Sequence, residues 1–388
     1  MTSTDGKFHL LFAAFMAGGN ATILENLQNE ITEDRDVYSS WLRIEIDPKR
    51  MTKFGERRSF LIPGTLRNSF VTSRRIHEFE KRGVIFDAAY FFQHTICFGL
   101  VSFRNRVPYV IAMDNTPMFC AKNELWYANP YFNPKTLGAK AKHMMTRSVY
   151  KNAFHLLPIS TKVRDSLIDD YHVSPEKITV VPPGIDINRF SFIDRNILNR
   201  SDKPFNIVFT GADFIRKGGD ILVSVASQPE FQDAQFTFIT KSFCGPEMKN
   251  MVVHDNISTN SHHMVELLQD ADIFVLPTRA DTFSIASLEA MATGLPVITV
   301  AVGGISDIVK HGETGFLIPQ GDIQSLVEHI RILRNDSRLR YLMGLKSRKR
   351  VERLFNSKLV SDTVVSILKK AAGRRTSLTS VEMSHVGR

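Results

Sequence analysis

The chain has 388 residues, of which 43% are hydrophobic, and a formal net charge of +9 at pH 7. This length exceeds what one hydrophobic core usually supports, and no apolar run reaches the roughly eighteen residues of a transmembrane helix, so two domains without a membrane span are predicted. The start MTSTDGK has no apolar signal core, which argues against secretion. Cys97, Cys120 and Cys244 lack the spacing of metal ligands, so no zinc site is predicted, and a reducing cytoplasm is the expected compartment.

The first predicted element is an apolar strand at residues 9–15, which ends near Gly18 and Gly19 and leads into a helical segment at residues 22–31. Glycine lets backbone amides approach a phosphate or a sugar closely, so Gly18 and Gly19 are candidate binding residues. A tight turn without a ligand is the alternative for this pair.

The most basic part of the chain is the segment 49–82, which contains ten Lys and Arg residues against three glutamates. Apolar residues such as Phe60 and Phe70 are interspersed among them. This mixture makes the segment a candidate for contact with a membrane surface or an acidic acceptor, and a plain solvated surface is the alternative. A second basic helix is predicted after Pro134. Nucleic acid is not expected as a partner, because no recognised nucleic-acid-binding motif is present.

Polar residues follow two further predicted strands, at residues 88–92 and 108–113, so that His94 and Asp114 are candidates for strand-end positions. For His94 the alternative is a buried or loop histidine without a ligand, and for Asp114 it is a structural turn. Another strand is predicted at residues 157–160. Pro182-Pro183-Gly184 then makes a stiff connection into a polar linker at residues 185–203.

The second half opens with a strand at residues 205–210, followed by Gly211, the run Arg216-Lys217-Gly218-Gly219 and an apolar helix from Asp220 onward. A strand, a glycine turn and cations beside a helix start form a site suited to a diphosphate. Lys217 is therefore a candidate binding residue, with an ordinary exposed lysine as the alternative.

The most informative stretch is ADIFVLPTRADTFSIASLEAMATGLPVITV, residues 271–300. A strand is predicted at residues 273–276, a helix at about 282–291 and a strand at 297–300. Asp281 precedes the helix, its start contains Phe283, Ser284 and Ile285, and Glu289 lies about two turns in. The alternatives are that Asp281 only caps the helix and that Glu289 is only a solvated helix residue.

Alternation of strands and helices in both halves predicts two doubly wound α/β units. Further helices are predicted at residues 337–355 and 358–372. The last residues, 374–388, have little apolar periodicity and are predicted to be disordered.

The chain resembles the retaining glycosyltransferases of family 4, also called glycosyltransferase group 1, which have the GT-B fold. Asp281, seven residues, Glu289 and then AMATGLPV follow the family signature, with Asp281 in place of its first glutamate. Lys217 matches the lysine of a second family element, whose arginine position holds Ala212. In several family members a histidine stands where this chain has Asp114.

The resemblance implies two Rossmann-like domains that face a central cleft. We expect an acceptor-side domain at residues 1–192, a nucleotide-sugar-binding domain at 193–355, a helix at 356–373 that returns to the first domain and a tail at 374–388. The linker near residues 185–203 and the returning helix are the expected hinges.

It further implies a retaining hexosyltransferase that moves a sugar from a nucleoside-diphosphate sugar to a glycan or lipid-linked acceptor, without a metal or another cofactor. By resemblance, Lys217, Arg216 and the start of the helix bind the diphosphate, Glu289 the ribose and Asp281 the donor sugar, with Lys217, Asp281 and Asp114 as candidate catalytic residues. The expected location is the cytoplasm, with the inner face of the membrane as a candidate site. A non-catalytic sugar-nucleotide-binding scaffold and a GT-B-like sugar-nucleotide epimerase remain the alternatives.

Overall fold

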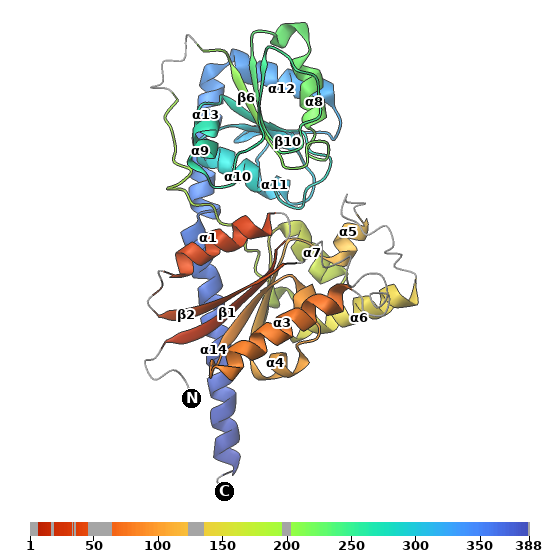
Figure 1. Ribbon diagram of the computed structural model, residues 1–388, viewed down its shortest axis with the longest axis vertical. Coiled ribbons are helices and arrows are strands. Elements are labelled where there is room, and N and C mark those ends of the chain that lie inside the picture. Colours follow the sequence, from red (N-terminus) through yellow and green to blue (C-terminus); the bar gives the residue numbers. More distant parts are fainter. Residues whose placement is uncertain are drawn as a thin grey trace. The chain divides into compact units, whose positions relative to one another are not determined.

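The structure is a computed structural model that describes residues 7–16, 19–32, 34, 36–45, 64–122, 136–195 and 203–386. The chain divides into two compact units (Figure 1). Of the described residues, those up to 182 and those from 360 onward form the first unit, and residues 183–359 form the second. Each unit is built on its own parallel sheet with helices packed against it.

The first unit contains a five-stranded parallel sheet in the order β2-β1-β3-β4-β5. The predicted strands at 9–15, 88–92 and 108–113 are confirmed within one residue at each end. The sequence analysis does not include β2, because this edge strand is only partly buried and its polar residues interrupt the apolar run. The strands are β1 (Phe8–Phe15), β2 (Val37–Ile44), β3 (Ala88–Phe92), β4 (Tyr109–Met113) and β5 (His155–Pro158).

The helices of the first unit follow or precede these strands in the βα alternation that a parallel sheet requires. The helix predicted at residues 22–31 is α1, and the basic helix predicted after Pro134 is α6. The helices are α1 (Asn20–Thr32), α3 (Gly64–Lys81), α4 (Val101–Arg106), α5 (Pro117–Lys122), α6 (Leu137–Asn152) and α7 (Thr161–Asp169).

The second unit contains a six-stranded parallel sheet in the order β11-β10-β9-β6-β7-β8. The strands predicted at 273–276 and 297–300 have the same bounds in the structure. The chain leaves β6 toward β7 on one side and later returns to β9 on the other, so the strand order reverses between β6 and β9. The strands are β6 (Asn206–Thr210), β7 (Gln235–Ile239), β8 (Met251–His254), β9 (Ile273–Leu276), β10 (Val297–Val300) and β11 (Gly315–Ile318).

The helices of the second unit include the one predicted after residue 281, which begins three residues later than expected because Ser284 caps it. They are α8 (Gly219–Ala226), α9 (His262–Gln269), α10 (Ile285–Ala292), α11 (Ile305–Ile308), α12 (Ile323–Asn335) and α13 (Ser337–Leu354). A last helix, α14 (Ser357–Val386), passes from the second unit into the first. It continues beyond residue 373, where the sequence analysis ends it and expects a disordered tail.

The segment that enters the second unit is bound to it by backbone contacts. The N–H of Ile185 donates to the carbonyl of Phe355 at 2.7 Å, and the N–H of Ser357 donates to the carbonyl of Ile185 at 3.0 Å. The Arg195 guanidinium donates to the carbonyls of Thr293 at 2.7 Å and Ala271 at 3.1 Å. The division of the chain therefore falls after residue 182, whereas the sequence analysis places it after residue 192.

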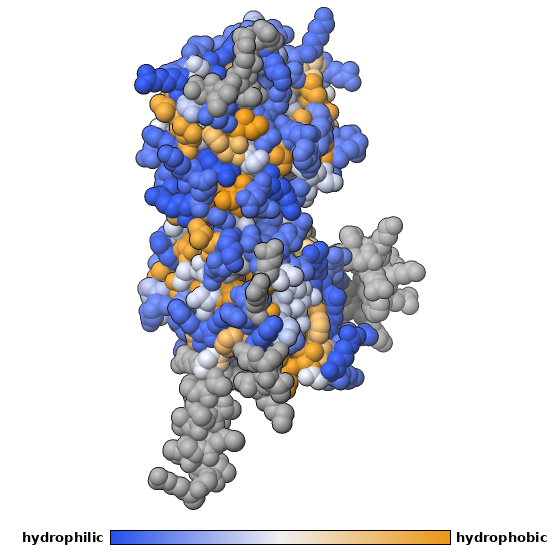
Figure 2. Space-filling view, turned by 90° about the vertical axis from the view of Figure 1, so that its left-hand side faces the viewer, coloured by the Kyte–Doolittle hydropathy of each residue, from blue (hydrophilic) through white to orange (hydrophobic). Residues whose placement is uncertain are grey.

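Each unit has its own core of aromatic and aliphatic side chains. Phe12 and Phe91 are fully buried in the first unit, as are Phe209, Phe238 and Phe274 in the second. On the face drawn in Figure 2 the surface is mostly hydrophilic, with apolar side chains in small separate groups. None of the helices in the described part of the chain has the length and hydropathy needed to cross a bilayer.

Candidate functional site

The candidate site of the second unit lies where the strand order reverses, between β6 and β9. In open parallel sheets the loops beyond the carboxyl ends of such strands leave a crevice that binds ligands. The loop after β6 carries Arg216 and Lys217, and the loop after β9 carries Asp281. The topology therefore brings together three residues that the sequence analysis selects.

The loop after β6 needs glycine for its path. Gly218 has a left-handed φ of +80°, and a Cβ atom added there would lie 2.1 Å from the carbonyl oxygen of Pro277. Gly211 lies against the stem of Lys217, with 2.9 Å between an added Cβ and the Lys217 Cβ. Gly218 thus lets the loop after β6 pack directly on the loop after β9, and Gly211 makes room for the Lys217 stem within the first of these loops.

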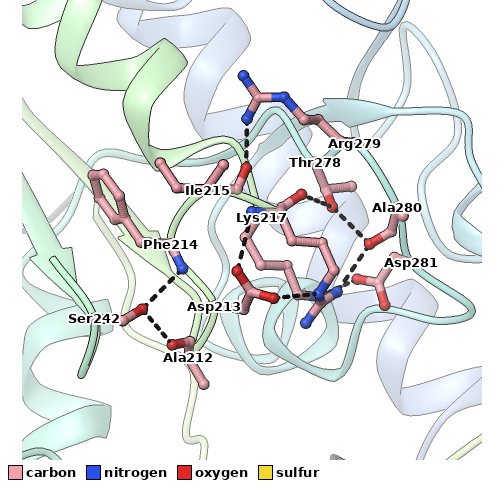
Figure 3. A network of polar contacts seen from close by, with 11 residues as sticks. Ala212, Asp213, Phe214, Ile215, Lys217, Ser242, Thr278, Arg279, Ala280 and Asp281 are labelled. Atoms are coloured by element: carbon pink, nitrogen blue, oxygen red, sulfur yellow. Dashed lines mark hydrogen bonds and ion pairs between the residues drawn. The ribbon is translucent and has the colours of Figure 1, made fainter. Parts of the chain in front are cut away.

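A serine on the neighbouring strand end holds this loop in place. The Ser242 hydroxyl accepts a hydrogen bond from the N–H of Phe214 at 3.1 Å and donates one to the carbonyl of Ala212 at 2.7 Å (Figure 3). The sequence analysis does not select Ser242, because an isolated serine after a strand has no spacing signal of its own.

Lys217 and Asp281 form an ion pair between the two loops (Figure 3). Only 13% of the Lys217 side chain and 6% of the Asp281 side chain are exposed. Lys217 is therefore not an ordinary exposed lysine. Asp281 is not the helix cap either, because Ser284 occupies the cap position of α10.

Arg216 braces the loop that carries Asp281. Its Nε contacts the Asp213 carboxylate at 3.0 Å, and its Nη1 donates to the carbonyl of Ala280 at 2.9 Å. The Thr278 hydroxyl lies 3.1 Å from the same Ala280 carbonyl. The guanidinium is thus occupied by protein groups, and Arg216 supports the loop backbone one residue before Asp281.

Two further contacts stiffen the same loop. Arg279 makes a two-pronged ion pair with Asp220 at the start of α8, with both N–O distances at 2.7 Å, and these hydrogen bonds lower the pKa of the Asp220 carboxyl. On the other side, a Cβ added at Gly303 would lie 2.0 Å from the carbonyl oxygen of Asp281. The backbone around Asp281 is therefore packed on both sides.

The start of α10 provides backbone N–H groups beside this loop. The Ser284 hydroxyl accepts from the N–H of Ser287 at 3.2 Å. The N–H groups of Ile285 and Ala286 have no partner four residues earlier within the helix, and the helix dipole adds partial positive charge there. Phe283 precedes the cap and is 7% exposed. This helix start suits an anion.

Glu289 is buried in the second turn of α10, with 3% of the residue exposed. Burial raises the pKa of its carboxyl to about 7, and the positive charge of Arg189 acts in the opposite direction. Among the described residues, no side-chain hydrogen bond engages this carboxylate. Glu289 is thus not a solvated helix residue.

The remaining predicted residues belong to the first unit. Gly18 lies outside the described residues, and Gly19 accepts the N–H of Ile23 at 3.2 Å near the start of α1. Asp114 follows β4 and accepts hydrogen bonds from the side chains of Gln93 and Asn115. Asp114 and Gly19 thus belong to the first unit, whereas Lys217 belongs to the second.

His94 is a buried histidine that packs in the core of the first unit. Its Nδ1 lies 3.0 Å from the Tyr150 hydroxyl, and its ring contacts Phe98 edge-on. Burial, reinforced by the charge of Lys142, lowers its pKa to about 3. The ring is therefore neutral at physiological pH. In the part of the chain that the structure describes, no group of three His, Cys, Asp or Glu side chains is placed to hold a metal ion.

Two protein families match adjoining segments that together cover most of the chain. Residues 44–189 match the family described as Glycosyltransferase Family 4, and residues 191–350 match Glycosyl transferases group 1. Both matches agree with the resemblance drawn from the sequence motifs.

Two curated relatives are similar to this chain. It is 28% identical over 241 residues to the MMP alpha-(1->4)-mannosyltransferase of Mycolicibacterium hassiacum, covering 59% of this chain and 57% of that protein. It is 31% identical over 263 residues to the capsular polysaccharide biosynthesis glycosyltransferase CapM of Staphylococcus aureus, covering 60% of this chain and 67% of that protein. The matched region spans about half to two thirds of the length of such relatives.

A solved structure shares the fold of the whole chain. HepE of Anabaena, in complex with UDP-glucose, superimposes with a TM-score of 0.65 at 16% identity, covering 93% of this chain and 99% of that one. The predicted fold class, two Rossmann-like units of the GT-B type, is confirmed by this likeness.

The close approach at Gly218 predicts a large cost for an added methyl group. Gly312 has a similar φ of +76° but nothing within 4 Å of an added Cβ, so it is a matched control. We expect Gly312→Ala to lower the free energy of unfolding by about 1 kcal/mol and Gly218→Ala by about 3 kcal/mol or more, because only the latter meets the Pro277 carbonyl. Urea denaturation measures both, and equal losses would contradict the described packing.

The raised pKa of Glu289 predicts a pH-dependent stability. Since the folded state holds this proton more tightly than the unfolded state, the stabilisation is complete below the ordinary pKa of about 4.5 and is lost as the pH rises through about 7. The neutral variant Glu289→Gln lacks this loss. Relative to wild type, we expect it to be more stable at pH 8 than at pH 5 by roughly 2–3 kcal/mol in urea denaturation. A difference that does not change with pH would refute the buried carboxyl.

Proposed function

The chain belongs to the group 1 and family 4 glycosyltransferases with the GT-B fold, and from this premise we propose that it is a retaining hexosyltransferase. It transfers a sugar from a nucleoside-diphosphate sugar to a glycan or lipid-linked acceptor. The pathway class that fits is the biosynthesis of surface polysaccharide or of another glycoconjugate, since the relative CapM is named for capsular polysaccharide.

The observation that carries this proposal is the meeting of Lys217, Asp281 and the start of α10 beyond β6 and β9. A nucleoside diphosphate is an extended anion that is also the leaving group of the reaction. A lysine and a helix N-terminus stabilise the negative charge that develops on it when the bond to the sugar breaks. The proposal assigns this stabilisation of the leaving diphosphate to protein groups alone and includes no metal ion.

The two carboxylates take different parts of the donor. Glu289 lies in the second turn of α10, where it accepts hydrogen bonds from the ribose hydroxyls, which suit an anionic acceptor. Asp281, in the loop before the helix, accepts hydrogen bonds from hydroxyl groups of the donor sugar. Arg216 acts through the loop, because its guanidinium holds Asp213 and the Ala280 carbonyl.

In the first unit, Asp114 and the loop of Gly18 and Gly19 are proposed to act on the acceptor side and on the sugar. The mechanism is a front-face one, in which the leaving phosphate helps to deprotonate the acceptor hydroxyl. Such a route retains the anomeric configuration without a covalent nucleophile. His94 is given no catalytic role, because its ring is buried in the core of the first unit beside the Tyr150 hydroxyl.

UDP-sugars are the first donors to test, because HepE, which shares the fold, is described in complex with UDP-glucose. The relatives also include a mannosyltransferase, so the sugar and the base both belong in the screen. This substrate class favours a location in the cytoplasm, at the inner face of the membrane.

Contact with the membrane surface is part of the proposal. Of the basic segment 49–82, residues 49–63 lie outside the described residues, and the rest forms α3 and the residue after it. On α3, Phe70 is 64% exposed one turn before Arg74. On α6, Leu137 and Met144 are 84% and 70% exposed. Exposed apolar side chains beside cations are typical of helices that bind anionic lipid.

Donor turnover tests the proposal. Wild-type protein should release free nucleoside diphosphate from one class of nucleotide sugar by transferring the sugar to an added acceptor or, more slowly, to water. Asp281→Asn should reduce this release by about 100-fold or more, because the carboxylate contact is lost. Asp281→Glu retains the negative charge and should retain most of the wild-type release of nucleoside diphosphate. Release is measured by anion-exchange chromatography, with folding checked by circular dichroism.

Three other outcomes are distinguishable in the same assay. Binding of a nucleotide sugar without release would support a non-catalytic scaffold, and isomerised donor without acceptor would support an epimerase. Full release by a folded Asp281→Asn variant would refute the assigned role of Asp281.

A further inference from the structure

Both cations at the candidate diphosphate site are already engaged by carboxylates of the same unit. Lys217 is paired with Asp281, and Arg216 is paired with Asp213. A nucleotide that binds here must therefore compete with protein anions for its cations. The outcome of that competition depends on what the displaced carboxylate contacts afterwards.

The two pairs differ in how easily they can be exchanged. Arg216 also binds the Ala280 carbonyl, and its own carbonyl accepts the N–H of Arg279 at 2.8 Å, so its position is fixed by several bonds. For the Lys217 ammonium, Asp281 is the partner within the described residues. The backbone of Asp281 is held by Gly303 and the braced Ala280. Of the two partners, the flexible lysine stem is the one that can move.

Burial makes the exchange costly for Asp281. Its side chain is 6% exposed, so little water surrounds the carboxylate to compensate for the ammonium when Lys217 turns to a phosphate. A buried carboxylate without a cation is strongly unfavourable, and a diphosphate nearby adds repulsion between like charges. Hydroxyl groups of a sugar remove part of this cost, because they donate hydrogen bonds to the carboxylate.

We propose that Asp281 is a specificity-determining residue that makes the site prefer a nucleotide sugar over the free nucleoside diphosphate. This inference rests on the proposed function and adds a second role for the same carboxylate. With the intact donor, Lys217 binds the diphosphate and the sugar hydroxyls satisfy Asp281. With the free nucleotide, Asp281 has no such donors and competes to regain Lys217.

The exchange has a consequence for the reaction cycle. Once the sugar has left, the carboxylate recovers its pairing only if Lys217 releases the diphosphate. The ion pair thus favours departure of the nucleotide product and limits inhibition by it. A site with a neutral residue at this position would bind the product more tightly.

The test compares the affinities of UDP and UDP-glucose, or of the cognate pair found in the donor screen, by isothermal titration calorimetry. Wild type should bind the nucleotide sugar about tenfold more tightly than the free nucleotide. Asp281→Asn should bind the free nucleotide about tenfold more tightly than wild type does, and its preference for the sugar conjugate should disappear. The wild-type ratio needs no variant, and equal or tighter binding of the free nucleotide by wild type would overturn the inference even if Asp281→Asn does not fold.

Asp220→Asn is the matched control, because it also neutralises a carboxylate, at the start of α8, that pairs with a cation of the loop after β9. It should change the affinity for the free nucleotide by less than about twofold. An equal gain in Asp220→Asn would show a general charge effect, and an unchanged or weaker affinity in folded Asp281→Asn would overturn the inference. If wild type binds no nucleotide of the screen, the proposed function itself fails, which is a separate result.

Discussion

The buried ion pair between Lys217 and Asp281 is the constraint on which the candidate site depends. The side chains of these two charges are 13% and 6% exposed, so each needs a partner of opposite charge or a hydrogen-bonding ligand, because leaving either one alone in this setting is strongly unfavourable. The pairing requires the loops after β6 and β9 to touch, and glycine at position 218 makes the contact sterically possible. The Arg216 and Arg279 contacts then hold the same two loops together.

Two arginines connect the segment that enters the second unit to the rest of that unit. Arg195 and Arg348 both donate to backbone carbonyls at the end of α10, and Arg348 also binds carbonyls of the segment that enters the unit. These carbonyls have no helical partner, so a guanidinium beside them satisfies several acceptors at once. The segment from residue 183 therefore belongs to the second unit, and α10 is held at both of its ends.

Much of the second unit could be predicted from the sequence. The strands β9 and β10 are short, mostly apolar runs, one ending before Pro277 and the other beginning after Pro296, which is why their predicted bounds are the same as in the structure. The helix carrying Glu289 and the loops of Lys217 and Asp281 are recognisable from motif spacing. The pairing of Lys217 with Asp281 is not, because a contact between residues 64 positions apart depends on strand order.

Other features of the structure could not be predicted from the sequence patterns. The edge strand β2 has too many polar residues to be recognised by an apolar run, and the role of Arg216 depends on carbonyl groups that no residue type encodes. The polar residues 195–203 are typical of a linker, yet Arg195 anchors their start to the second unit. Contacts of side chains with the backbone, such as those of Arg216 and Arg195, were therefore among the features that sequence patterns did not predict.

Equilibrium binding of a labelled nucleotide sugar to wild type and Lys217→Met is the most direct test of the central claim, that the loops after β6 and β9 hold the diphosphate. The substitution keeps the length of the side chain and removes its charge, and thermal unfolding checks that the variant is folded. The account predicts saturable binding by wild type and a loss of affinity of at least about tenfold in Lys217→Met. Equal affinities in the two proteins would contradict it.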